Sequence, residues 1–198
     1  MSGCDCEFEI KNKQQKTVLK QLLIINAVMF FLEISLGVIA QSTALIADSL
    51  DMLADASVYG IGLYAVGRSA SVKRLAARLS GVLQITLGIA VVVDVTRRYF
   101  YGSEPDHWLM MVVGMVALIA NLMCLKLLSK HRDGEVHMRA SWIFSKNDVI
   151  ANIGIILSGI IVFFSGQALP DLVIGLIISL VVIRGGFAIL NQVKQETC

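Results

Sequence analysis

Three aspartates lie close together in one apolar segment of the chain: Asp48, Asp51 and Asp55. At about 100° per residue of α-helix, Asp51 and Asp55 differ by about 40° around the axis, and Asp48 lies about 60° from Asp51 on the other side. All three therefore share one face over about two turns. An ionised carboxylate at the centre of a bilayer costs about 2.5–3.5 kcal/mol, so this face requires a cation, protons or polar neighbours.

A second apolar segment carries Asp148 and Asn152, which share a helix face because they are four residues apart. Asn147 points about 100° away from Asp148, toward either a neighbouring helix or the same cavity. Carboxylate and amide oxygens from two helices suit a divalent cation. The sequence therefore predicts a metal site drawn from six residues: Asp51, Asp55, Asp148, Asn152, Asn147 and Asp48.

Each of these residue types also has a purely structural interpretation. The aspartates can be neutral or hydrogen-bonded to a neighbouring helix. This interpretation suits a single aspartate better than three aspartates on one face. Asn152 can join two membrane helices by hydrogen bonding. Asp48 lies nearest the start of its segment and can cap or orient the helix. Glu33 is alone on its segment and receives no site role, and Asp94 is expected to pair with the nearby Arg97 and Arg98.

The composition identifies the environment in which these residues lie. Of 198 residues, 56% are hydrophobic and only 16% are charged, and the mean hydropathy is +0.74. These values exclude a disordered chain and disfavour an ordinary soluble domain. A net charge of +2 gives no reason to expect a nucleic-acid partner, and the four cysteines form neither a disulfide framework nor a paired C-x-x-C motif. The chain is expected to be a membrane protein.

Six apolar stretches approach or exceed the roughly 20 residues that cross a bilayer as a helix. They span residues 22–40, 43–66, 79–101, 107–128, 138–164 and 169–190. The predicted fold is therefore an all-α membrane protein with six transmembrane helices. Residues 1–20 form a polar N-terminal tail, residues 21–190 the membrane domain, and residues 191–198 a short C-terminal tail with no room for a soluble domain.

The basic residues predict the orientation in the membrane. Fourteen lysines and arginines fall in the two tails and in the segments on their side, whereas only Arg97 and Arg98 fall on the other side. Because cytoplasmic segments carry the excess of Lys and Arg, both termini are expected to be cytoplasmic. We expect an integral, multi-pass protein of a bacterial inner membrane.

The chain resembles the cation diffusion facilitator transporters over nearly its whole length. Residues 30–33 and 42–55 resemble helices 1 and 2 of that family, and residues 115–128, 138–140 and 170–171 resemble its later helices. Helix 2 of the family carries His or Asp followed four residues later by Asp, a metal-binding pair that maps to Asp51 and Asp55. The resemblance implies a transporter, not an enzyme.

Two departures from the family pattern affect this interpretation. The second pair of the family, in helix 5, maps to Phe144 and Asp148, and a phenylalanine cannot coordinate a metal. The resemblance thus implies three retained ligands, with Asn147, Asn152 or water supplying the rest. Zinc-selective members generally use imidazole at the missing position, and oxygen-only ligands relax the preference toward harder or larger ions. The second departure is the expected absence of the cytoplasmic C-terminal domain, so a homodimer would form through the membrane helices.

The expected function is export of a divalent cation in exchange for protons. Zinc is expected first, with cadmium, cobalt, iron(II), nickel and manganese as further substrates, and no cofactor is expected to be bound permanently. Protons would compete with the ion for the same carboxylates as the helices rock between two orientations. Two alternatives stay open: a proton-coupled exporter of organic cations, and a metal-binding membrane protein that transports nothing.

Overall fold

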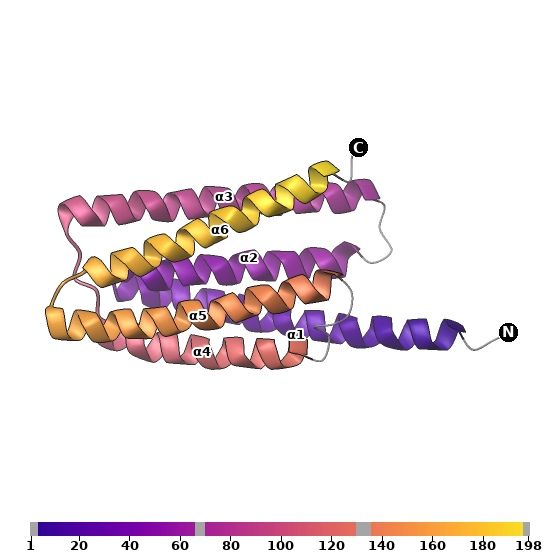
Figure 1. Ribbon diagram of the computed structural model, residues 1–198, viewed down its shortest axis with the longest axis horizontal. Helices are drawn as coiled ribbons and strands as arrows, with labels where there is room; N and C mark the ends of the chain where they lie inside the picture. The colour runs from indigo at the N-terminus through magenta and orange to yellow at the C-terminus, as the bar shows by residue number, and fades with distance from the viewer. Residues whose placement is uncertain (1–3, 66–69, 130–135, 196–198) are drawn as a thin grey trace.

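The structure is a computed structural model that describes residues 4–65, 70–129 and 136–195. This part of the chain forms six α-helices and no strand, as Figure 1 shows. The helices are α1 (Cys4–Ile39), α2 (Thr43–Ala65), α3 (Ala70–Tyr101), α4 (His107–Ser129), α5 (Val136–Ser165) and α6 (Leu169–Gln195). The predicted all-α fold is therefore confirmed.

Five of the six helices are long and apolar enough to cross a membrane: α1, α3, α4, α5 and α6. The exception is α2, which has the same 23-residue length as α4 but carries three aspartates. It contacts each of the other five helices and is the central helix of the bundle. Its polar face therefore meets protein rather than lipid, which is where intramembrane acids are normally found.

The helices pack in antiparallel pairs. The pairs α1 with α2, α3 with α6, and α4 with α5 make the most extensive contacts, and α2 joins the α3–α6 pair to the rest. In Figure 1, α3 and α6 lie above α2, with α4 and α5 below it. The start of α1 and the end of α6 lie at the same end of the bundle, hereafter the terminal end. An even number of spans predicts this placement.

Three helices begin earlier than the sequence predicts, α5 by only two residues and the other two by nine or more. α1 begins at Cys4, so most of the polar tail continues the first span as one helix, and α3 begins at Ala70 rather than at residue 79. Apolar stretches define only the part of a helix that lies in the membrane. The alanines, leucines, lysines and arginines before residue 79 are good helix formers and extend α3 beyond it. The predicted break at residues 130–134 lies outside the described residues.

The three turns that the structure describes are short and have identifiable causes. α1 and α2 are joined by three residues, of which Gln41 adopts a positive φ of 49°. Gly102 and Gly166, which follow α3 and α5, have φ values of 85° and 65°. Glycine adopts this left-handed conformation without a steric penalty and ends helices in this way.

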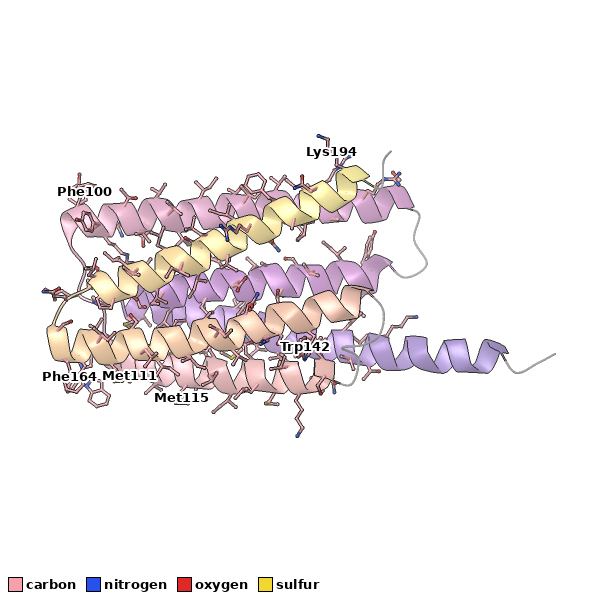
Figure 2. All side chains as sticks on the ribbon, viewed as in Figure 1. Phe100, Met111, Met115, Trp142, Phe164 and Lys194 are labelled. Atoms are coloured by element: carbon pink, nitrogen blue, oxygen red, sulfur yellow. The ribbon has the colours of Figure 1, made fainter. Side chains whose placement is uncertain are left out.

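The outer surface of the bundle is apolar over most of its length. Phe31, Phe100 and Phe164 are between 66% and 81% exposed. Figure 2 shows Lys194 at the terminal end of the bundle and Phe100 and Phe164 near the opposite end. A soluble monomer does not expose large apolar side chains on this scale, so this surface is typical of a membrane protein.

Candidate metal site

A cavity of about 370 Å³ lies between α2, α3, α5 and α6. Its acidic wall residues are Asp51 and Asp55 of α2 and Asp148 of α5, and its apolar wall includes Val58 of α2 and Val182 of α6. The wall residues come from the middle of α2 and from the second half of α6. Because both helices run toward the terminal end, the cavity extends from the middle of the bundle toward that end.

The three carboxylates reach the cavity because α2 and α5 are packed side by side. The Asp51 and Asp148 carboxyl groups lie within hydrogen-bonding range of each other, across the contact between the two helices. Asp55 accepts a hydrogen bond from the hydroxyl of Tyr59, one turn later on α2, at 3.0 Å. The tyrosine fixes the orientation of this carboxylate and leaves its other oxygen without a bond to Tyr59.

The six predicted site residues separate into two groups. Asp51, Asp55, Asp148 and Asn147 line the cavity. Asp48 and Asn152 do not line it, and both are fully buried. They lie beside each other and beside Glu33 of α1, on the side of the cavity away from the terminal end. The one-face argument for α2 thus places Asp48 next to the cavity but not in its wall.

The cavity is not a closed coordination sphere. Within the described residues, no three His, Cys, Asp or Glu side chains converge closely enough to hold a metal ion. The side chain of Phe144, which the family pattern aligns with a missing ligand, lies outside the described residues. Any ion in the cavity would therefore complete its shell with water or with amide oxygens such as that of Asn147.

Sequence reasoning missed three residues around this region. Gln84 of α3 and Arg184 of α6 line the cavity, and Glu33 lies against Asp48. Gln84 is a buried amide in an apolar helix, and Arg184 lies three residues after Val181 of the cavity wall, as residues on one helical face do. Each was a visible polar residue in a membrane span, but its partner helix could not be known.

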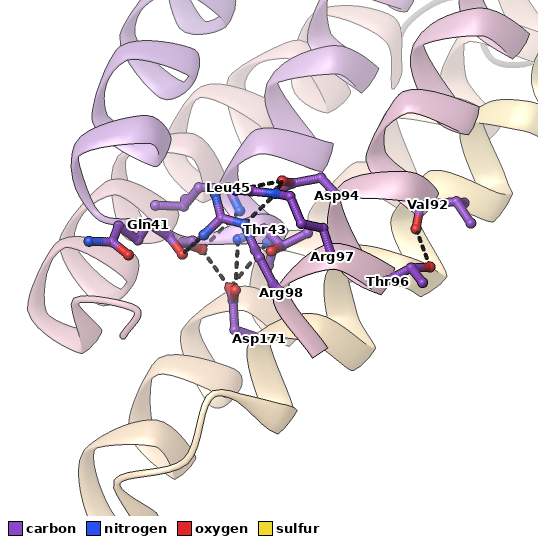
Figure 3. A network of polar contacts seen from close by, with 11 residues as sticks. Gln41, Thr43, Leu45, Val92, Asp94, Thr96, Arg97, Arg98 and Asp171 are labelled. Atoms are coloured by element: carbon purple, nitrogen blue, oxygen red, sulfur yellow. Dashed lines mark hydrogen bonds and ion pairs between the residues drawn. The ribbon is translucent and has the colours of Figure 1, made fainter. Parts of the chain in front are cut away.

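At the opposite end of the bundle, a polar network fixes the start of α2 (Figure 3). Asp171, at the beginning of α6, accepts hydrogen bonds from the Ser42 hydroxyl at 2.5 Å and from the backbone amides of Thr43 and Ala44 at 2.7 and 3.1 Å. A carboxylate from one helix thereby caps the first turn of another. The cap attaches the start of α2 to the start of α6.

The same network includes the end of α3. Asp94 forms ion pairs with Arg97 and Arg98 at 2.7 and 2.5 Å, as the sequence predicts. Arg98 also donates a hydrogen bond to the backbone carbonyl of Gln41, in the turn between α1 and α2. The turn before α2 is thus bonded to α3, while the first turn of α2 is bonded to α6.

Comparison with known proteins identifies relatives of this chain. Residues 19–195 match the model of the cation efflux transmembrane domain. The chain is 28% identical over 186 residues to the metal cation efflux system protein CzcD of Cupriavidus metallidurans, an alignment that covers 88% of this chain and 59% of that protein. It is 24% identical over 187 residues to the zinc transporter ZitB of Escherichia coli, covering 87% and 59% of the two chains.

A third relative carries a more detailed name. It is the cadmium, cobalt and zinc/H(+)-K(+) antiporter of Bacillus velezensis, 23% identical over 186 residues, with 85% of this chain and 59% of that protein covered. The chain thus spans somewhat less than two thirds of the length of the curated relatives that it matches.

Proposed function

The chain belongs to the cation efflux family, and on that premise we propose that it is a multi-pass membrane transporter that exports divalent metal cations. The observation that carries the proposal is the convergence of Asp51, Asp55 and Asp148, from two helices, on one cavity. Because the relatives are bacterial, we place the protein in a bacterial inner membrane.

The chemistry of the cavity fits a divalent cation. Its wall carries three carboxyl groups, and Asn147 adds an amide group to the same wall. Oxygen ligands bind zinc, manganese and other borderline or hard ions. An ion between Asp51 and Asp148 would also remove the repulsion between two carboxylates that lie within hydrogen-bonding range. Zinc is the first candidate substrate because relatives of this chain are named for it.

Exchange for protons follows from the same carboxylates. When the cavity opens to the cytoplasm, the ionised aspartates bind the metal ion. When the helices rock and the site opens to the other side, protons compete for the same oxygens and release it. Metal export is then driven by the proton gradient, and the direct test is metal flux against an imposed pH difference.

The experiment that tests the proposal is metal transport by the purified protein in proteoliposomes. We expect Asp51→Asn and Asp148→Asn each to reduce transport of zinc by more than about tenfold, since each removes a charged ligand. Asp106→Asn is the matched control. Asp106 is exposed and accepts bonds from the amides of Trp108 and Leu109 at the start of α4, a capping role that asparagine fills equally well. Unchanged transport in both cavity variants would refute the proposal.

The cavity gives less support to the two alternatives. Organic cations are typically bound by aromatic side chains, and none of the described residues that line the cavity is aromatic. A protein that binds metal without moving it would show zinc binding but no flux. The same proteoliposome assay, repeated with an organic cation, separates all three functions.

A further inference from the structure

A second group of polar side chains is buried beside the cavity, and it comes from three helices. Glu33 of α1, Asp48 of α2 and Asn152 of α5 are each 0% exposed. Asp48 lies beside both of the others. None of the three belongs to the cavity wall. We call this group the occluded cluster.

The oxygens of the occluded cluster form no hydrogen bond of ordinary length and angle, although the Asp48 carboxyl group lies within range of Glu33 and Asn152. Both carboxylate oxygens of Glu33, both of Asp48 and the side-chain oxygen of Asn152 are buried without a hydrogen bond. The side-chain nitrogen of Asn152 donates to the backbone carbonyl of Asp148 at 2.9 Å, which holds the amide in place. Within the described part of the chain, no lysine or arginine forms an ion pair with Glu33 or Asp48.

The surroundings of Glu33 and Asp48 differ from those of a structural acid elsewhere in the same bundle. Asp171 is also fully buried, but its oxygens accept three hydrogen bonds. An unpaired buried carboxylate costs far more than it returns unless a cation or a proton compensates it. Asp48 lies next to both Glu33 and Asn152, and two carboxylates with an amide oxygen supply five oxygen atoms, the kind of ligand that a hard or borderline divalent ion takes.

The position of the occluded cluster relates it to the cavity. On α2, Asp48 lies about 4.5 Å along the axis from Asp51, and on α5, Asn152 lies about 6 Å from Asp148. α2 and α5 run in opposite directions, so both steps lead away from the terminal end (Figure 1). The cavity carboxylates and the occluded cluster are therefore successive layers along the bundle.

We propose that Glu33, Asp48 and Asn152 form a second, occluded site for the divalent cation, one layer beyond the cavity. The proposal rests on the proposed function, because it assigns the next position to an ion that first binds Asp51, Asp55 and Asp148. An ion that moves between the layers passes from one carboxylate pair to the next, and α2 contributes a carboxylate to each.

The test is equilibrium binding of zinc and of manganese to the purified full-length protein in detergent. We expect the wild type to bind two ions per chain. Asp51→Asn should lose the ion of the cavity, and Glu33→Gln should lose the other ion or weaken its binding by about tenfold or more, because even outer-shell changes cost that much. Glu104→Gln, at an exposed glutamate, is the matched control and should bind like the wild type.

A folding measurement keeps the test valid. Glu33→Gln replaces a buried carboxyl group, which forms no hydrogen bond of ordinary geometry, by an amide of the same size, so the melting temperature without metal should not fall. The stabilisation that added metal gives to the wild type should shrink in this variant. A large fall without metal, together with undiminished binding of both ions, would show that Glu33 has only a structural role and would overturn the proposal.

The remaining outcomes distinguish the two sites. One ion per chain that is lost with Asp51→Asn and kept with Glu33→Gln overturns the second site and leaves the proposed function intact. One ion that is lost with Glu33→Gln but kept with Asp51→Asn supports the occluded site and contradicts the cavity site. If no ion binds at all, both proposals fail.

Discussion

The carboxylate of Asp171 accepts hydrogen bonds from the start of a helix other than its own. It bonds to Ser42, Thr43 and Ala44, and so adds to the local cap in which the Ser42 hydroxyl accepts a hydrogen bond from the Leu45 amide. Free amides at a helix start also favour a nearby negative charge. One residue therefore both seals the start of α2 and attaches it to α6.

Substituting Asp171→Asn should destabilise the protein while leaving the cavity residues in place. Asparagine offers one acceptor oxygen and directs an NH₂ group at donors, so we expect a loss of about 1–3 kcal/mol. The measurement is thermal unfolding of the purified protein in detergent. Ser42→Ala removes two bonds, the one that the Ser42 hydroxyl donates to Asp171 and the one that it accepts from the Leu45 amide, and should also destabilise the protein. A melting temperature equal to that of the wild type in both variants would contradict the capping role.

Phe144 offers a test of ion selectivity. It lies one helical turn before Asp148 on α5, at the position where the family pattern has a coordinating residue. Phe144→His should therefore raise the affinity for zinc relative to manganese, because imidazole suits zinc and carboxylate oxygens suit manganese. We expect a shift of about tenfold or more in the ratio of the two dissociation constants. Phe144→Leu is the control, and an equal ratio in the two variants would refute the prediction.

The arrangement of residues within one helix could be predicted from the sequence, whereas the metal site itself stays a prediction. The face shared by Asp51 and Asp55 follows from helical period alone, and both residues line the cavity. Asp48 lies on the same face but contacts Glu33, and no periodicity reveals which residue of another helix will lie opposite. The family resemblance, which the domain match confirms, named Asp51, Asp55 and Asp148, all of which line the cavity, but gave no role to Glu33.

The contact between α3 and α6 depends on glycine at the element scale. A Cβ atom at Gly186 would lie 2.7 Å from the side chain of Ile85 and 2.8 Å from the carbonyl oxygen of Gly81. Small residues let two membrane helices approach this closely. Since α6 carries Arg184 and Val182 of the cavity wall, the α3–α6 contact also determines the shape of the cavity.

We therefore expect Gly186→Ala to push α6 away from α3 and to destabilise the fold by about 1–3 kcal/mol, as overpacking does. Gly154→Ala on α5 is the matched control, because the nearest atom to its added Cβ is an Ile174 methyl group at 3.5 Å, an ordinary contact. Thermal unfolding of the two variants should differ clearly. Equal melting temperatures would show that the helices adjust without cost.

Helix boundaries were predicted well only where the membrane sets them. α4 begins at the predicted residue and ends one residue later than expected, because charged or polar residues flank both ends of its apolar stretch in the sequence. α3 begins nine residues before its predicted start, since hydropathy marks where a helix leaves lipid and not where the helical conformation ends. Packing partners were beyond prediction, because every apolar face looks alike when lipid and protein are equally apolar.

At the scale of the whole molecule, the layered placement of polar groups implies one open end. The cavity extends toward the terminal end, the occluded cluster lies beyond it, and the Asp171 and Arg98 networks close the far end. If the termini are cytoplasmic, as the basic residues predict, the cavity faces the cytoplasm. An exporter must bind its substrate from that side, so the orientation and the proposed function agree.

This orientation can be measured by cysteine accessibility. The experiment uses a variant without its four native cysteines. In this background, Ala188→Cys on the cavity wall should react with a membrane-impermeant maleimide in inside-out vesicles. Zinc should protect this cysteine, because the ion and the reagent share the cavity. Ser165→Cys is the control. Ser165 is exposed at the end of α5, opposite the terminal end, and its cysteine should react only in right-side-out vesicles. Labelling of both cysteines from one side would contradict the topology, and labelling of Ala188→Cys from the Ser165 side alone would mean that the cavity opens outward.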